Sequence, residues 1–300
     1  MKTMMNLRML LAMTFSLVSF TAFSGEKIDK MLEVSAQGEI EIHNNRGQIS
    51  VKGWDKSQVV IKGELDDLAE KFIFSTNGNK TIIKVVLPDR NVSARSGSGS
   101  DLKIFVPMNS SVLFGGVATD INFSKIYNGL EVSSVSGDIK INDTKKRTYI
   151  NSVSGDIKLR RVSGNIEIST VSGDVDAKVD ANKINIGGVS SDIVVKTKDI
   201  DFAKLSTVSG DTMLFGQLLK DGEIKLSNVS GDSHFYVIGE LNALVDLETG
   251  PGGDVSNQYS SHKPTSSFIG SEKLKFTAGN GDGSIRMSTV SGSIGLKGKN

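Results

Sequence analysis

The chain has 300 residues, with 35 Lys and Arg against 34 Asp and Glu, three His and no Cys. The lack of Cys excludes disulfides, thiolate nucleophiles and Cys-based zinc sites. The even charge balance excludes the strongly basic composition typical of nucleic-acid-binding domains, whereas 32 Gly with only 4 Pro and 1 Trp suit turn-rich β-structure.

Residues 1–24 predict a secretory signal peptide. Lys2 and Arg8 form a positive start, Met9 to Phe23 is an apolar stretch, and Ala22-Phe23-Ser24 has the small-x-small pattern of a cleavage site. The stretch is shorter than the ~20 residues that a membrane-spanning helix needs; an uncleaved N-terminal anchor is the alternative. Cleavage before Gly25 would remove two basic side chains and no acidic one, so the charges stay nearly balanced. We therefore expect an exported protein, either periplasmic or at the cell surface or secreted.

Residues 25–116 predict a less regular, β-rich portion. Glu39 to Ile42 and Gln48 to Val51 alternate apolar and polar side chains, which is typical of a strand with one buried face. Glu64 to Lys71 predicts a short helix. We interpret residues 25–116 as a capping portion, because the end of a repeat array must be covered.

A Val-Ser-Gly-Asp-Ile motif then recurs along the chain. Successive copies begin at intervals of nine or twice nine positions at first, then at slightly longer intervals, and one distant copy follows near the end. This spacing predicts a nine-residue unit of one turn and one short strand, two units making a coil. The copies, some with a substituted residue, begin at Val117, Val135, Val153, Val162, Val171, Val189, Val208, Val229 and Val290.

The repeat predicts an all-β fold over residues 117–300, a single-stranded, β-helix-like β-solenoid with roughly 18-residue coils. Ile157 and Leu159 alternate with polar neighbours, and Ser-Gly-Asp is turn chemistry. Stacked coils would place Val over Val and Ile over Ile in apolar columns that only an array can bury. An antiparallel meander folded into a sandwich is the alternative. The repeat lapses in an irregular excursion near residues 248–283, a natural place for function because loops on rigid scaffolds often carry it.

The repeated acids are the first candidates for chemistry, because stacked coils would align them about 4.8 Å apart. Calcium-binding nonapeptide repeats have Gly-Gly-x-Gly-x-Asp, whereas each unit here has one Gly and one Asp. We therefore interpret these acids as exposed turn residues, compensated by lysines such as Lys140 and Lys158. We interpret Gly279 to Gly283 as a tight turn in the same way. The acids are Asp120, Asp138, Asp156, Asp174, Asp192, Asp211 and Asp232.

The sequence contains no residue pattern that indicates an enzyme. A polysaccharide-active solenoid would need one local carboxylate pair, whereas the acid pairs here recur along the chain as structural turns would. The change of one local acid, such as Asp254 or Asp282, to Asn would test for an enzyme. His43, His234 and His262 share no motif, and neither a Gly-x-Ser-x-Gly elbow nor a phosphate-binding loop is present. We predict no enzyme, no catalytic, cofactor-binding or metal-ligating residue, and no cofactor.

The chain resembles the bacterial "putative adhesin" family of β-solenoid domains of unknown function. The resemblance is carried by Ile42-His43-Asn44-Asn45-Arg46-Gly47-Gln48-Ile49-Ser50-Val51-Lys52-Gly53-Trp54-Asp55, by the Ser-Gly-Asp repeats, and by Thr289-Val290-Ser291-Gly292-Ser293-Ile294. It implies an envelope or secreted protein without known catalytic residues.

The expected function is that of a non-catalytic, exported envelope protein. It would act as a binding or scaffold module, holding an envelope protein or a glycan on a rigid solenoid surface. We expect no nucleic-acid partner and no transmembrane span in the mature chain. The alternative is a periplasmic envelope-stress or assembly factor that recognises a peptide or lipid, for example at an exposed strand edge.

Overall fold

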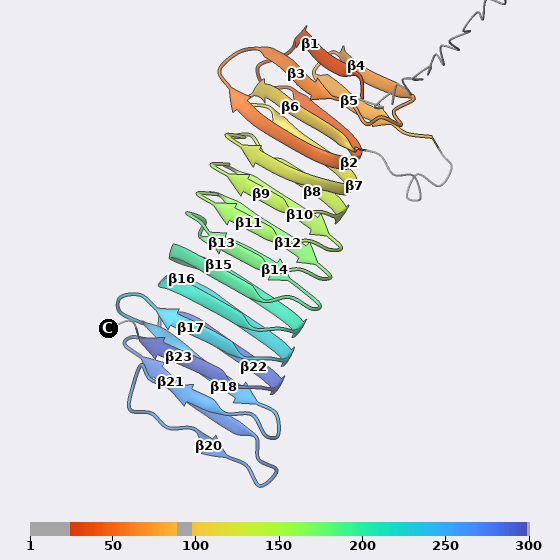
Figure 1. Ribbon diagram of the computed structural model, residues 1–300. Helices are drawn as coiled ribbons and strands as arrows, with labels where there is room; N and C mark the ends of the chain where they lie inside the picture. Colours follow the sequence, from red (N-terminus) through yellow and green to blue (C-terminus); the bar gives the residue numbers. More distant parts are fainter. Residues whose placement is uncertain (1–24, 89–97, 299–300) are drawn as a thin grey trace, which may run out of the picture.

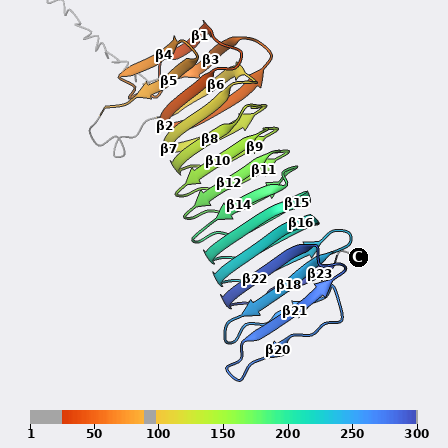
Figure 2. The same ribbon diagram turned by 180° about the vertical axis from the view of Figure 1, so that it is seen from behind.

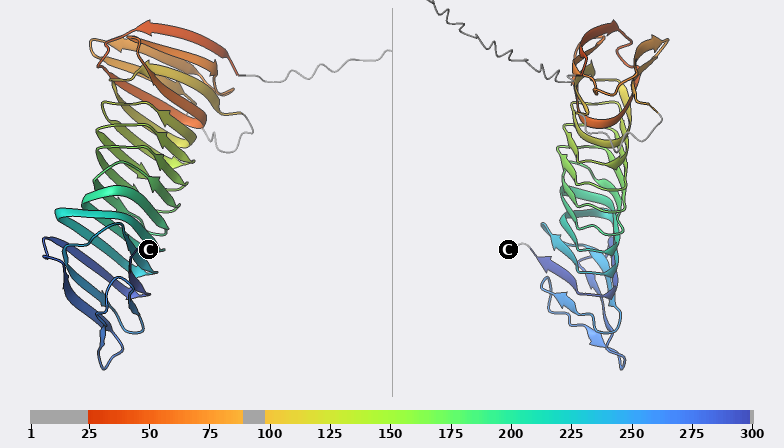
Figure 3. Two further views of the ribbon diagram at one scale, coloured as in Figure 1. Left: turned by 90° about the vertical axis from the view of Figure 1, so that its left-hand side faces the viewer. Right: turned by 45° about the vertical axis from the view of Figure 1, so that its right-hand side comes forward.

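The computed structural model describes residues 25–88 and 98–298, so the predicted signal peptide lies outside the described residues. All regular structure in these ranges is β-strand, which confirms the all-β prediction. Across the same residues, no helix has the length and hydrophobicity needed to cross a membrane. The strands form one elongated stack, seen from opposite sides in Figures 1 and 2 and from two further directions in Figure 3.

The middle of the stack has two faces of parallel strands. Face A contains the first half of β7 (Ser111–Ser124), β8 (Leu130–Ser136), β10 (Arg147–Ser152), β12 (Asn165–Thr170), β14 (Lys183–Gly187) and the second halves of β15 (Ile193–Ser209) and β16 (Thr212–Ser230). Face B contains the second half of β7, β9 (Ile139–Asn142), β11 (Ile157–Arg160), β13 (Val175–Lys178), the first halves of β15 and β16, and β17 (Ser233–Val237).

The core lies between the two faces. On face B, Ile157 pairs with Ile139 on one side and with Val175 on the other, and all three side chains are at most 1% exposed. Each partner is the equivalent residue of the adjacent coil, so equivalent side chains stack in buried columns. This in-register parallel pairing makes the fold β-solenoid-like and excludes the antiparallel meander for these strands.

The motif valines are the exception to the predicted burial. Val135 is 48% exposed, whereas Leu130, Val132 and Ser134 on the same strand are buried. Strict alternation along β8 therefore directs Val135 outward, and the following Ser-Gly turn resets the phase so that Ile139 points inward. Val162, the copy at the nine-residue offset, is fully buried. The two nine-residue units are thus not equivalent, and the expectation of a buried valine column is wrong.

The predicted helix at residues 64–71 is also absent. The segment between β3 (Gln58–Glu64) and β4 (Lys71–Asn77) contains one turn, at residues 67–68, and a bend at residue 70. The carboxylate of Asp66 accepts a hydrogen bond from the amide of Leu68 (2.9 Å), and its backbone oxygen accepts one from Ala69 (2.9 Å). Asp66 is simultaneously bonded to Arg46, which fixes the turn and prevents helix formation.

The end of the stack that contains the N-terminal strands does not follow the order of the sequence. β2 (Glu39–Trp54) pairs with β7 on one side and, on the other, with β5 (Lys80–Val86) and β6 (Ser100–Pro107). Antiparallel strands complete this end: β4 beside β5, β3 beside β6, and β1 (Lys27–Glu33) beside β3. The outermost strand β1 carries four charged residues besides its apolar ones, which discourages pairing with another chain.

The opposite end is permuted in a similar way. β22 (Gly283–Ser291) lies between β16 and β18 (Ala243–Thr249), and β23 (Ile294–Gly298) lies between β17 and β19 (Val255–Asn257). β21 (Glu272–Ala278) pairs antiparallel with β18, and β20 (Thr265–Ser266) pairs antiparallel with β21. The last copy of the motif therefore stacks directly on the copy that begins at Val229, although several strands separate the two in the sequence.

Candidate functional site

The seven repeated acids form one column along an edge of the stack, hereafter the Asp column (Asp120, Asp138, Asp156, Asp174, Asp192, Asp211 and Asp232). In each coil, Oδ1 of the Asp accepts a hydrogen bond from the backbone amide of the next coil's equivalent residue, at 2.7–3.1 Å. The last acceptor, Asp232, receives the amide of Ser293. Of the two lysines expected to compensate these charges, Lys158 approaches Asp156 at 4.0 Å, and no described carboxylate lies within that distance of Lys140. These acids therefore link neighbouring coils.

Replacing Asp156 with Ala should lower the free energy of unfolding by about 1 kcal/mol, because the amide of Asp174 loses its acceptor. Asp156→Asn keeps an oxygen at that position and removes one of the aligned charges, so its stability should equal or exceed that of the wild type. Urea denaturation would measure both. Asp180→Ala is the control, because that exposed side chain accepts no hydrogen bond from the described residues. Equal losses for Ala and Asn would contradict the acceptor role.

A second row crosses the outer surface of face B, hereafter the cation row. Each member lies seven residues after the motif valine of its coil, and the pairing registers place the members side by side on adjacent strands. Five strand steps of about 4.8 Å make the row about 24 Å long. In spatial order its members are Arg160, Lys178, Lys196, Phe215, Tyr236 and Lys297.

Aromatic rings hold two of these cations in place. The rings of Phe215 and Tyr236 stack at 4.2 Å between centroids and 5° between planes. Nζ of Lys196 lies 5.1 Å from the centre of the Phe215 ring, and Nζ of Lys297 lies 5.2 Å from that of Tyr236. Both distances are within the range of cation–π attraction. The aromatic pair thus spaces two ammonium groups along the row.

The cations of this row are largely unneutralised. Arg160 is paired with the carboxylate of Asp176. Among the described residues, no carboxylate lies within 4.0 Å of Lys178, Lys196 or Lys297. A groove of about 670 Å³ opens beside the row and adds further bases to it. Its lining includes Arg161, Lys178, Lys196 and Lys198, with Asp180 as its one acid. The row and groove together can attract an extended anion.

His234 lies on β17 two residues before Tyr236, with 6.2 Å between the ring centroids. Burial lowers the pKa of His234, and the nearby Lys297 lowers it further, against a smaller opposing effect of Asp232. The imidazole is therefore neutral at pH 7. It contributes no positive charge to the cation row.

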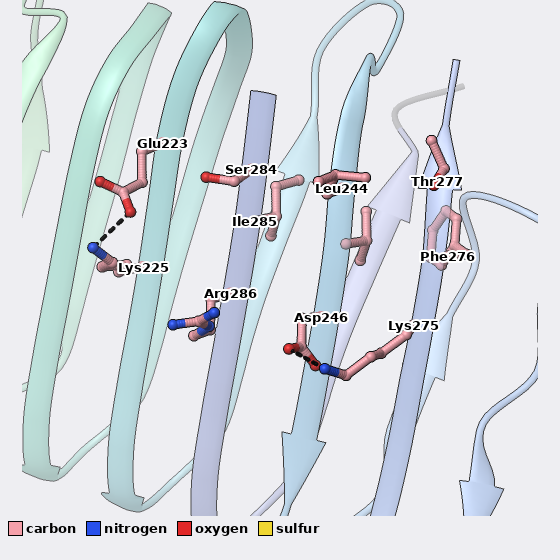
Figure 4. Close-up of a pocket in the computed structure, with 11 residues that line it drawn as sticks. Glu223, Lys225, Leu244, Asp246, Lys275, Phe276, Thr277, Ser284, Ile285 and Arg286 are labelled. Carbon is pink, nitrogen blue, oxygen red and sulfur yellow. Dashed lines mark ion pairs between the residues drawn. The ribbon is translucent and has the colours of Figure 1, made fainter. Parts of the chain in front are cut away.

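A second groove, of about 540 Å³, lies on face A across β16, β22, β18 and β21. Figure 4 shows Arg286 projecting between two ion pairs, Lys225–Glu223 at 2.6 Å and Lys275–Asp246 at 2.8 Å. No described carboxylate forms an ion pair with Arg286 itself. Two acids thus offset two of the three bases, so this groove attracts anions less strongly than the cation row does.

Comparison with known proteins places the chain in a family. The family model described as Toastrack DUF4097 matches residues 18–297, which is nearly the whole sequence. The chain belongs to the Toastrack DUF4097 family. This confirms the resemblance noted in the sequence. No protein of curated function matches the chain.

Several solved structures are similar to this Toastrack family member. A putative adhesin from Bacteroides fragilis is 14% identical, with 91% of this chain and 98% of that chain covered and a TM-score of 0.46. A putative lipid binding protein from Parabacteroides distasonis is 13% identical, with coverage of 91% and 97% and a TM-score of 0.37. A putative cell adhesion protein from Clostridium sporogenes is 12% identical, with coverage of 91% and 100% and a TM-score of 0.23.

The other residues singled out in the sequence do not come together in this Toastrack fold. His43 contacts Glu41 at 2.6 Å near one end of the stack, whereas His262 stacks on Phe276 near the other. Asp254 and Asp282 are both exposed, one after β18 and one just before β22. Within residues 25–88 and 98–298, no three His, Asp or Glu side chains are grouped so that they could hold a metal ion.

Proposed function

We propose that this protein is a non-catalytic binding module of the bacterial cell envelope, which holds an anionic glycan chain along the cation row. One observation carries the proposal: Lys178, Lys196 and Lys297 lie in one row without carboxylate partners among the described residues. A rigid stack fixes their spacing before a ligand arrives, which reduces the entropy lost on binding.

The proposal includes the location and organisation of the chain. The apolar N-terminal stretch with Ala22-Phe23-Ser24 supports export, to the periplasm or to the cell surface. Residues 25–116 would cap the stack, and residues 117–300 would provide the repeat-built binding surface, with the excursion near residues 248–283 closing the other end.

Binding of polygalacturonate, a linear carboxylated glycan, to residues 25–300 would test this function by calorimetry. We expect saturable binding that weakens as salt is raised from about 20 to about 200 mM, because exposed charge pairs are screened. Lys178→Gln combined with Lys196→Gln should weaken binding about five- to thirtyfold, since each lost charge interaction contributes on the order of 0.5–1 kcal/mol. Neutral dextran should not bind.

Lys103→Gln combined with Lys140→Gln is the matched control. Lys140 projects from β9 on face B and Lys103 projects from β6, and both side chains lie beside Asp101, Asp120 and Asp138, where an anion is repelled. Equal losses in the two double variants, or no binding of polygalacturonate at all, would refute the cation row as the site. Release of reducing ends by the wild type but not by Asp254→Asn would instead establish a polysaccharide-active enzyme.

A further inference from the structure

The outward-facing motif valines form a continuous apolar ridge, hereafter the valine column. Each of its eight side chains is 44–58% exposed, and each occupies the coil next to that of its neighbour in the column. Its members, in spatial order, are Val117, Val135, Val153, Val171, Val189, Val208, Val229 and Val290.

The repeat retains valine here although the core does not need it. The residue immediately before these valines varies between copies and is Ser, Thr, Asn or Gly. Eight half-exposed valines present on the order of 500 Å² of apolar surface, near the upper end of what a monomer ordinarily exposes in one patch. A patch of this size and regularity is typical of an interaction surface.

Two different columns flank the ridge. On the face B side, three residues after each of the first seven valines, lies the Asp column, and Ser293 takes this place after Val290. On the face A side, two residues before each valine, lies a column without charge, hereafter the neutral column. It consists of Gly115, Ser133, Asn151, Ser169, Gly187, Ser206, Ser227 and Ser288. The ridge therefore separates a row of carboxylates from a row of uncharged groups, most of them hydrogen-bond donors.

We propose that a second copy of this chain covers the valine column, with the two stacks side by side and parallel. A twofold axis along the stack would bring the two valine columns together and place the Asp column of each copy against the neutral column of the other. Ser and Asn side chains would then donate hydrogen bonds to the carboxylate oxygens left free by the coil-to-coil bonds.

Electrostatics selects this orientation. A twofold axis perpendicular to the stack would make the copies antiparallel and set the two Asp columns against each other, so that six carboxylates of one copy would face six of the other. The parallel arrangement keeps like charges on opposite sides of the ridge. Contact over both ridges and their flanking columns would bury more than the roughly 1,000 Å² expected of a specific interface. The cation row lies outside this contact, so the pairing does not depend on the proposed glycan.

Engineered cysteines can test both the pairing and its direction, because the chain has no Cys of its own. Val135 and Val229 are the second and seventh members of the valine column. Identical residues meet in a parallel pair, so Val135→Cys alone and Val229→Cys alone should each give disulfide-linked dimers under mild oxidation. In an antiparallel pair, position 135 meets position 229, and only a mixture of the two variants would cross-link efficiently. Met31→Cys, on β1 and 57% exposed, is the control for random collision.

Cross-linking of both single variants well above the Met31→Cys level supports the proposal. Cross-linking only in the mixture, or none above the control, overturns it.

Light scattering of residues 25–300 provides a second readout. The combined variant Val153→Thr, Val171→Thr and Val189→Thr should raise the dimer dissociation constant at least tenfold, with unchanged circular dichroism. Met31→Thr with Leu244→Thr, which are comparably exposed elsewhere, should leave it unchanged. A wild type that stays monomeric at all concentrations would also overturn the proposal.

Discussion

Arg46→Met should lower the free energy of unfolding by about 3–5 kcal/mol, the cost of removing one partner from a buried ion pair. The guanidinium of Arg46 donates to both carboxylate oxygens of Asp66, at 2.5 Å from Nε to Oδ2 and 2.7 Å from Nη2 to Oδ1. Asp66 is only 3% exposed. Without Arg46, a negative charge would remain in the interior. This pair joins β2 to the turn that follows β3, so the loss would loosen the end of the stack that contains the N-terminal strands.

The pH dependence follows from the same pair. Burial alone would raise the pKa of Asp66, but the hydrogen bonds from Arg46 and from the amide of Leu68 outweigh it, so this pKa lies below its ordinary value of 3.8. A lowered pKa adds stability at pH values above 3.8, and this stability is lost as the pH falls through the lowered value. In Arg46→Met the carboxylate can be protonated more easily. The difference in stability between wild type and variant should therefore narrow below about pH 4.

Urea denaturation at pH 7, 5 and 3.5 would measure this narrowing. Arg147→Met is the matched control, because Arg147 pairs with Glu167 at 3.0 Å but both side chains are substantially exposed. Exposed pairs contribute about 0–1 kcal/mol. Similar losses in the two variants would show that burial of Asp66 is not what gives the pair its strength.

Gly155→Ala should destabilise the stack by about 3 kcal/mol, because two separate costs add together. Gly155 has a φ of +108°, and a Cβ there would lie 2.3 Å from the carbonyl oxygen of Gly137 in the neighbouring coil. The positive φ alone costs a side-chain-bearing residue roughly 1–2 kcal/mol. The collision with backbone adds to this, because the coils cannot separate without stretching the bonds between them.

Gly78→Ala gives the cost of a side chain at a positive φ where no collision occurs. Gly78 also has a positive φ, +60°, but nothing lies within 4 Å of a Cβ added there. It should cost about 1 kcal/mol. Thermal denaturation followed by circular dichroism would compare the two variants. If Gly78→Ala proved as damaging as Gly155→Ala, the close approach of neighbouring coils would not be the reason for glycine in the motif.

The repeat predicts the core well, because period-two alternation directly specifies which side chains point inward. Ile139, Ile157 and Val175 are buried as their pattern requires. The motif valines are the exception, because the alternation of the preceding strand continues through Val135 and its phase changes only at the following glycine. The helix predicted at residues 64–71 does not form, because Arg46, twenty residues earlier, donates a hydrogen bond to Asp66 and holds the segment in a turn.

The cation row was missed although its signal is present in the sequence. Its members recur at the same intervals as the motif copies themselves, because each lies at a fixed distance from a motif valine. Aligning the copies and inspecting the seventh position after each valine would have revealed the row. An alignment of the copies does not reveal that Lys297 lies beside Tyr236 in space, because this contact depends on where β23 inserts into the stack.

That insertion also dictates an order of assembly. Most coils pair with the coil just before them in the sequence, so a short loop closure suffices and the middle of the stack can grow locally. β22 must instead find β16 past the intervening strands, and it must enter between β16 and β18. During synthesis or translocation from the N-terminus, the edges of β16 and β17 would stay open until residues 283–298 emerge. A chaperone that recognises open strand edges would therefore act on this intermediate. Pulse-labelling hydrogen exchange should show that the amides facing β22 and β23, in the second half of β16 and in β17, gain protection last among the strands of the stack.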